Sequence, residues 1–137
     1  MLNTDDAQGF IFDCDGTLLD SLDAWDEAER DLFAQTGPLT AEQKDLIHSA
    51  PIERAAELFH EFGAGESADD VLAHLDGHLL PFYRGARALP GAVEFVRKVA
   101  AVGVPCVVVS SSPRRYLEAG LEHVGRLDCF AERVSTD

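Results

Sequence analysis

The sequence predicts an α/β fold in which a parallel sheet carries an inserted block of helices. Two short apolar runs, at residues 9–12 and 104–109, each end in polar residues, as buried strands of a parallel sheet do. A third run begins near residue 133. Between the first two runs, residues 21–84 show helical spacing of apolar side chains almost throughout.

Turn and capping residues divide this central block into separate helices. Ser21 can cap the first helix, and Thr40 followed by Gln43 fits a capping box at the start of the second. Pro51 suits the first position of a third helix. The helices predicted in this block cover residues 21–36, 40–48, 51–62 and 67–84.

The pattern changes after residue 89, where helices and strands begin to alternate. Helices are predicted at residues 92–102 and 113–124, on either side of the second strand. Alternating strands and helices with continuously apolar strands indicate a parallel, Rossmann-like sheet. We therefore expect an α/β core made of residues 1–20 and 85–137, with residues 21–84 inserted as a helical domain.

The composition and net charge of the chain exclude some classes of binding partner. The chain has 137 residues, 46% of them hydrophobic, and a net charge of −14. Such a charge argues against nucleic acid and anionic membranes as partners, since both require clustered basic residues. Three cysteines without a CxxC pair, no apolar run of spanning length and no signal peptide predict a cytoplasmic protein with reduced thiols.

Polar residues follow both predicted strands at the edge where parallel sheets bind ligands. Asp13 and Asp15 follow the first strand, and Ser110, Ser111 and Ser112 follow the second. Two carboxylates one residue apart repel each other unless a cation or a shared proton compensates, and Mg²⁺ is the usual cation. A DxD pair alone would more often be an acidic turn, so the choice between an acidic turn and a metal site depends on the longer string around the pair.

That string, FIFDCDGTLLDS at residues 10–21, resembles the first motif of the haloacid dehalogenase superfamily. The resemblance implies that Asp13 is the nucleophile that forms an aspartyl-phosphate, and that Asp15 is the general acid and base. It implies that the Asp13 carboxylate and the Asp15 backbone carbonyl hold Mg²⁺, and that backbone N–H groups near Gly16 bind the phosphoryl oxygens. An acid at position 15 favours phosphoryl transfer over dehalogenation.

The second strand resembles the second motif of that superfamily. By this resemblance Ser110 binds a phosphoryl oxygen, and Ser111 and Ser112 belong to the same phosphate site, next to a helix N-terminus. Arg114 is a candidate substrate contact, although a solvated face explains it equally well. Without the first motif, the three serines would read as a flexible loop with a helix cap.

The helical block resembles the α-helical cap of the subgroup that contains β-phosphoglucomutase and phosphoglycolate phosphatase. Such a cap selects the substrate and excludes water. Arg54 lies where a mutase would place a phosphate-binding arginine, and is a candidate substrate contact. His74 and His78 are four residues apart, but a metal would need more ligands, so we expect a solvated helix face.

The chain departs from the family at two later motifs. The lysine and the acidic motif that the family places after further strands have no counterpart up to Asp137, and Lys44 and Lys98 fall on predicted helices. We therefore expect an incomplete sheet, weak or no activity of this chain alone, and a homo-oligomer or strand exchange at the open sheet edge.

The leading functional hypothesis is a Mg²⁺-dependent phosphatase that acts on a small phosphorylated metabolite. One alternative is a β-phosphoglucomutase-like mutase of sugar phosphates, and another is a truncated, non-catalytic binding module. The sequence leaves the particular substrate open.

Overall fold

The computed structural model describes residues 8–125 and 127–136, and the chain forms two compact units. The sheet unit contains the chain up to Ser21 together with residues 83–136. The helical unit contains residues 22–82. Each unit has its own buried core, and each is described here by itself.

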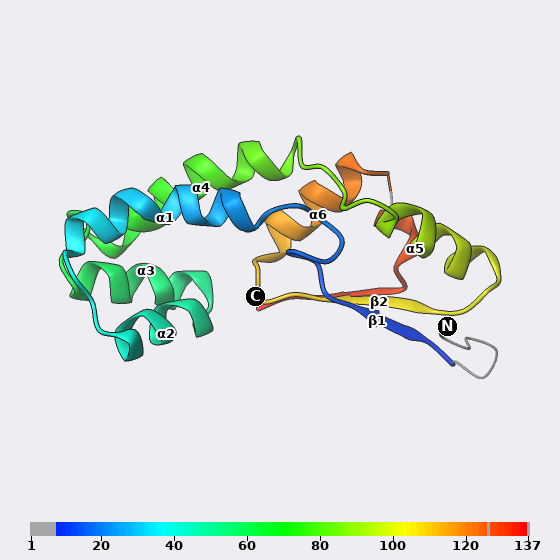
Figure 1. The fold of residues 1–137 in the computed structure, drawn as a ribbon, viewed down its shortest axis with the longest axis horizontal. Helices are drawn as coiled ribbons and strands as arrows, with labels where there is room; N and C mark the ends of the chain where they lie inside the picture. Colours follow the sequence, from blue (N-terminus) through cyan, green and yellow to red (C-terminus); the bar gives the residue numbers. More distant parts are fainter. Residues whose placement is uncertain (1–7, 126, 137) are drawn as a thin grey trace. The chain divides into compact units, whose positions relative to one another are not determined.

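The sheet unit is a three-stranded parallel sheet with two covering helices (Figure 1). Its strands are β1 (Phe10–Phe12), β2 (Cys106–Val109) and β3 (Glu132–Val134), in the order β1-β2-β3. Helix α5 (Ala92–Ala101) precedes β2, and helix α6 (Arg114–His123) connects β2 to β3. The predicted α/β fold class with a parallel sheet is confirmed.

One face of the sheet is packed and the other is open. Phe10 and Phe12 pack edge-on against Phe95 of α5, with ring centroids 5.8 and 6.0 Å apart. On the opposite face Ile11, Val109 and Val134 are 79%, 41% and 46% exposed. The prediction of fully buried strands is therefore wrong for this face. Both right-handed crossovers advance in the same direction across the sheet, so α5 and α6 cover the same face.

Three local details differ from the sequence-based boundaries. Strand β2 begins at Cys106 because Pro105 has no N–H to donate, although the Pro105 carbonyl accepts the Phe10 N–H at 2.9 Å. A short 3₁₀ helix, η1 (Leu127–Cys129), lies between α6 and β3, where no element was predicted. Pro51 and Pro113 each lie just before a helix, at the N-cap, instead of at its first helical position.

The helical unit contains four helices, as the sequence predicted. They are α1 (Leu22–Thr36), α2 (Ala41–Ser49), α3 (Ile52–Glu61) and α4 (Ala68–Tyr83), whose last residue belongs to the sheet unit. The predicted capping box is present, since the Gln43 N–H donates to Thr40 Oγ1 at 3.2 Å and the Thr40 N–H to Gln43 Oε1 at 2.9 Å. Within the described residues, no helix is both long and apolar enough to cross a membrane.

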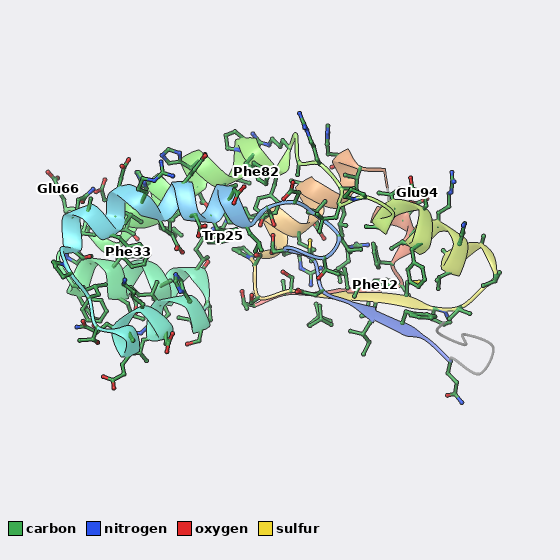
Figure 2. All side chains as sticks on the ribbon, in the orientation of Figure 1. Phe12, Trp25, Phe33, Glu66, Phe82 and Glu94 are labelled. Atoms are coloured by element: carbon green, nitrogen blue, oxygen red, sulfur yellow. The ribbon has the colours of Figure 1, made fainter. Side chains whose placement is uncertain are left out.

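Aromatic and aliphatic side chains fill the core of the helical unit. Phe33 points from α1 toward α3 (Figure 2), and its ring centroid lies 4.9 Å from that of Phe59. One acid, Glu29, is buried beside this core, and its Oε2 lies 3.1 Å from His48 Nε2. Burial raises the pKa of the Glu29 carboxyl, the nearby His48 opposes this effect, and Asp26 adds to it. Burial is the largest cause, so the folded chain holds the Glu29 proton up to a higher pH than an ordinary glutamate does.

Gly120 of α6 allows a close approach inside the sheet unit. A Cβ added there would lie 2.4 Å from Leu19 Cδ1 and 3.2 Å from Tyr83 Cδ1. Leu19 and Tyr83 are both fully buried, so neither can move away freely. Gly77 of α4 is also helical, but an added Cβ would meet nothing within 4 Å.

Gly120→Ala should therefore lower the free energy of unfolding by about 1 kcal/mol. Overpacking costs about 1–3 kcal/mol and exceeds the roughly 1 kcal/mol that alanine gains over glycine in a helix. Gly77→Ala, the matched control, should gain up to about 1 kcal/mol because only the propensity term applies. Urea denaturation measures both, and an equal gain in the two variants would contradict the packing described for Gly120.

Glu29→Gln should become increasingly stable relative to the wild type as pH rises above the ordinary glutamate pKa of 4.5. The unfolded chain loses the Glu29 proton there while the folded chain keeps it, so wild-type stability is lost as pH rises through the raised folded-state value. Denaturant titrations over a pH series test this prediction. Glu27→Gln, at an exposed position of the same helix, reports the effect of removing a charge. A difference that stays constant with pH would contradict the raised pKa of Glu29.

Candidate active site

The chain folds back sharply after β1 and forms a tight turn. The Cys14 carbonyl accepts the N–H groups of Thr17, Leu18 and Leu19 at 3.1, 2.8 and 3.0 Å. Gly16 has a φ of 75°, which favours glycine, and its N–H donates to the Leu19 carbonyl at 2.9 Å. This geometry holds the acidic residues on either side of Cys14 in a fixed turn at the carboxyl end of β1.

Within this turn, Asp15 is surrounded by four hydroxyl groups, which we call the hydroxyl shell: Ser21, Tyr83, Ser110 and Ser112. Ser21 Oγ donates to Asp15 Oδ1 at 2.5 Å, and the Tyr83 hydroxyl donates to the same oxygen. Ser112 Oγ donates to Asp15 Oδ2 at 2.6 Å, and Ser110 Oγ lies 3.4 Å from it. Hydroxyl donors of this kind make short, charge-assisted hydrogen bonds to a carboxylate. The shell therefore fixes the position of both Asp15 oxygens.

Asp13 has a different environment from Asp15. Its side chain is exposed, and its Oδ1 accepts the Cys14 N–H at 2.8 Å. Cys14 itself is buried, and burial followed by the charges of Asp15 and Asp13 raises the pKa of its thiol. The thiol stays protonated at neutral pH, so Cys14 is a packing residue, and Asp13 carries the exposed carboxylate of the turn.

The structure brings two of the three predicted serines to Asp15. Ser110 and Ser112 are buried, and the Ser112 N–H donates to Ser110 Oγ at 3.1 Å. Ser111 is exposed, and its carbonyl accepts the Thr136 hydroxyl at 3.1 Å. The carboxyl ends of β1 and β2 therefore place Asp15, Ser110 and Ser112 together, while Ser111 faces away from this cluster of hydrogen bonds.

Two other groups that were predicted to contact phosphate or substrate already have partners within the protein. The Gly16 N–H, predicted to bind phosphate, is used by the turn. Arg54 is exposed on α3 and makes ion pairs with Glu57 and Glu61 at 2.7 and 2.9 Å. The substrate roles of Gly16 and Arg54 stay predictions, and a bound phosphate would compete with these existing partners.

Arg114 of α6 also has partners within the sheet unit. Arg114 donates to the Arg133 carbonyl at 2.9 Å and lies 3.5 Å from Glu118. Lys44 and Lys98 lie on α2 and α5, on helices as predicted. The role of Arg114 in substrate binding likewise stays a prediction.

Sequence reasoning missed two members of the hydroxyl shell. Ser21 was interpreted as a helix cap, and Tyr83 was assigned no role in the site. Both side chains are fully buried, and the Tyr83 ring stacks on Tyr116 at a centroid distance of 5.1 Å. A buried tyrosine hydroxyl needs a hydrogen-bond partner, so a tyrosine in an apolar helix could have indicated a buried polar contact. The sequence does not identify the partner.

With this geometry in place, comparison with known proteins assigns the family. Residues 10–137 match the haloacid dehalogenase-like hydrolase family. The chain therefore belongs to this family, and the resemblance predicted from residues 10–21 is confirmed.

Relatives of established name fall in the predicted subgroup. Hexitol phosphatase A of Escherichia coli is 33% identical over 107 residues, which cover 76% of this chain and 48% of that protein. A phosphoglycolate phosphatase of Rhodospirillum rubrum is 31% identical over 138 residues, covering 93% of this chain and 57% of that protein. The chain thus spans about half the length of these relatives.

A solved structure shows the same fold at lower sequence identity. The crystal structure of CbbY from Rhodobacter sphaeroides in complex with phosphate has a TM-score of 0.69 and 16% identity, covering 93% of this chain and 63% of that chain. At this identity the likeness supports the fold alone.

Tyr83→Phe and Ser112→Ala should each lower the free energy of unfolding by about 1–2 kcal/mol, because each removes a hydrogen bond to a carboxylate. Phenylalanine keeps the ring stack on Tyr116, so the Tyr83 variant isolates the hydroxyl. Ser111→Ala, the matched control at an exposed position, should stay within about 0.5 kcal/mol of the wild type. Urea denaturation measures all three, and equal effects of the two serine variants would contradict the hydroxyl shell.

Proposed function

We propose that this chain carries the nucleophile and the acid/base group of a Mg²⁺-dependent phosphatase that acts on a small phosphorylated metabolite. The observation that carries the proposal is the unequal environment of two carboxylates on one turn. Asp13 is exposed, whereas four hydroxyls hold Asp15. A nucleophile must reach the phosphorus atom, and an acid/base group must be held in a fixed position beside it.

The proposed reaction has two steps. In the first, an Asp13 oxygen attacks phosphorus, the bond to the leaving alcohol breaks, and Asp15 donates a proton to that alcohol oxygen. In the second, Asp15 accepts a proton from water as the water attacks phosphorus, which releases phosphate and regenerates Asp13. The aspartyl-phosphate thus divides one difficult displacement into two easier ones.

The hydroxyl shell suits a group that changes its protonation state in each cycle. Serine and tyrosine hydroxyls can either donate or accept a hydrogen bond. When Asp15 carries a proton, one shell hydroxyl can rotate so that its oxygen accepts a hydrogen bond from the protonated carboxyl. The shell can therefore hold the side chain in place in both halves of the reaction, with little movement of the surrounding backbone.

The residues present fit a magnesium ion. Mg²⁺ prefers oxygen ligands, and typically takes one or two carboxylates together with phosphate oxygens. The Asp13 carboxylate is exposed, and within the described part of the chain only its Oδ1 accepts a hydrogen bond, from the Cys14 N–H. We therefore assign the Asp13 carboxylate and the Asp15 backbone carbonyl as the ligands of Mg²⁺. The bound ion would supply positive charge against the phosphoryl oxygens, which matters in a chain with a net charge of −14.

The names of the relatives support the proposed substrate class. One relative is a hexitol phosphatase and another a phosphoglycolate phosphatase, so a small alcohol phosphate, such as a sugar phosphate, is the proposed substrate. The mutase alternative is less well supported, since its candidate phosphate ligand, Arg54, is paired with two glutamates.

The test compares hydrolysis of an aryl phosphate and an alkyl phosphate, with and without Mg²⁺. Asp13→Asn should abolish turnover of both because it removes the nucleophile. Asp15→Asn should slow the alkyl ester by about 100- to 10,000-fold, because its alkoxide leaves only when protonated. It should slow departure of the aryl group far less, since a phenolate is stable without the proton.

Asp23→Asn, at an exposed position in the first turn of α1, is the matched control and should leave the rates unchanged. Asp15 also acts as the base of the second step, which both esters share, so the comparison is made on the first turnover. Equal slowing of alcohol and phenol release there would contradict the role of Asp15 as general acid. Absence of Mg²⁺-dependent turnover in the wild type would favour a non-catalytic phosphate-binding module.

A further inference from the structure

Two helices of the helical unit bring three metal-ligand side chains together, none of which belongs to the proposed catalytic turn. His74 and His78 lie four residues apart on α4, and Asp31 lies on α1. The ligand atoms of these three residues all lie within 4.8 Å of one another. The sequence showed the histidine pair, but the third ligand is 43 residues away in the chain and is supplied only by the fold.

His74 is held in an orientation that suits a metal ligand. Its Nε2 lies 3.1 Å from the backbone carbonyl of Ala28, which can only accept, so Nε2 carries the hydrogen in the neutral ring. Nδ1 then carries the lone pair. Metal-binding histidines usually donate their other ring N–H to a carbonyl or carboxylate in this way, which fixes both tautomer and ring orientation.

The other two side chains are accessible. Asp31 and His78 are exposed and His74 is half-buried, and the rings of the two histidines lie 4.6 Å apart. Within the described part of the chain, neither the Asp31 carboxylate nor the His78 ring takes part in a hydrogen bond or ion pair. A metal ion would therefore displace no existing protein partner at either residue.

We propose that Asp31, His74 and His78 form a binding site for a divalent transition-metal ion with the ligand preference of Zn²⁺. Two imidazoles and one carboxylate suit zinc-like ions, whereas Mg²⁺ prefers oxygen ligands alone. The fourth position of the ion remains open to water. Because it joins α1 to α4, the ion acts as a cross-link between two helices that are distant in sequence.

The geometry requires a small side-chain adjustment on binding. Two ligands of a tetrahedral ion with bonds of about 2.1 Å lie about 3.4 Å apart. The observed limit of 4.8 Å therefore requires a movement of about an ångström, which rotation of the exposed Asp31 and His78 side chains can provide. His74, held by Ala28, serves as the fixed point of the site.

The experiment titrates the whole chain with Zn²⁺ by calorimetry and with Co²⁺ by visible absorption, in the presence of excess Mg²⁺ to occupy oxygen-only sites. The variants His74→Gln, His78→Gln and Asp31→Asn each remove one ligand. His123→Gln, at an exposed position in the last turn of α6, is the matched control. Thermal melting with and without Zn²⁺ provides the second readout.

The wild type and His123→Gln should bind one equivalent of Zn²⁺ with the same affinity and melt at a higher temperature when it is present. Each ligand variant should bind at least about tenfold more weakly and lose the thermal shift. Asp31 and His78 are exposed, so these two variants should fold even if His74→Gln does not. Unchanged affinity or thermal shift in both would overturn the proposal, as would thiolate absorption bands in the Co²⁺ complex.

Discussion

The hydrogen bonds to the Asp15 carboxylate tie together the parts of the sheet unit that are most distant in sequence. They come from Ser21 at the end of the turn after β1, from Tyr83 at the end of α4, and from Ser110 and Ser112 after β2. A carboxylate that is half removed from water depends on such donors, and each donor is buried and depends on it in turn. The chain therefore leaves the sheet unit after Ser21 and re-enters it at Tyr83, and both of these residues donate to the same carboxylate.

Packing around that point keeps it in place. Gly120 lets α6 approach Leu19 and Tyr83, whose ring stacks on Tyr116. The tight turn around Cys14 fixes the backbone on the other side. A turn held by packing and by hydrogen bonds can keep two carboxylates in different environments, with one residue between them. This arrangement supports our proposal that Asp13 attacks phosphorus and that Asp15 transfers the proton.

Much of this arrangement follows from the sequence. The features that could not be predicted from it have one physical cause in common. The strands, the helices and the capping box at Thr40 depend on local patterns of a few residues, and they were predicted almost to the residue. The exposure of Ile11 was missed because an apolar run does not reveal how many faces of a sheet are covered. The sequence did not reveal the hydrogen bond of Tyr83 to Asp15 or the place of Asp31 beside His74. These partners lie 68 and 43 residues apart in the chain, and only tertiary folding brings them together.

The most direct test of the account is to identify the residue that becomes phosphorylated. The chain would be mixed with Mg²⁺ and a reactive phosphate donor, quenched, treated with borohydride to reduce any acyl phosphate to an alcohol, and analysed by peptide mass spectrometry. The account predicts homoserine at position 13, and none in a sample without donor. Reduction at position 15, a phosphoester on Ser110 or Ser112, or phosphate release with no modified residue would contradict it.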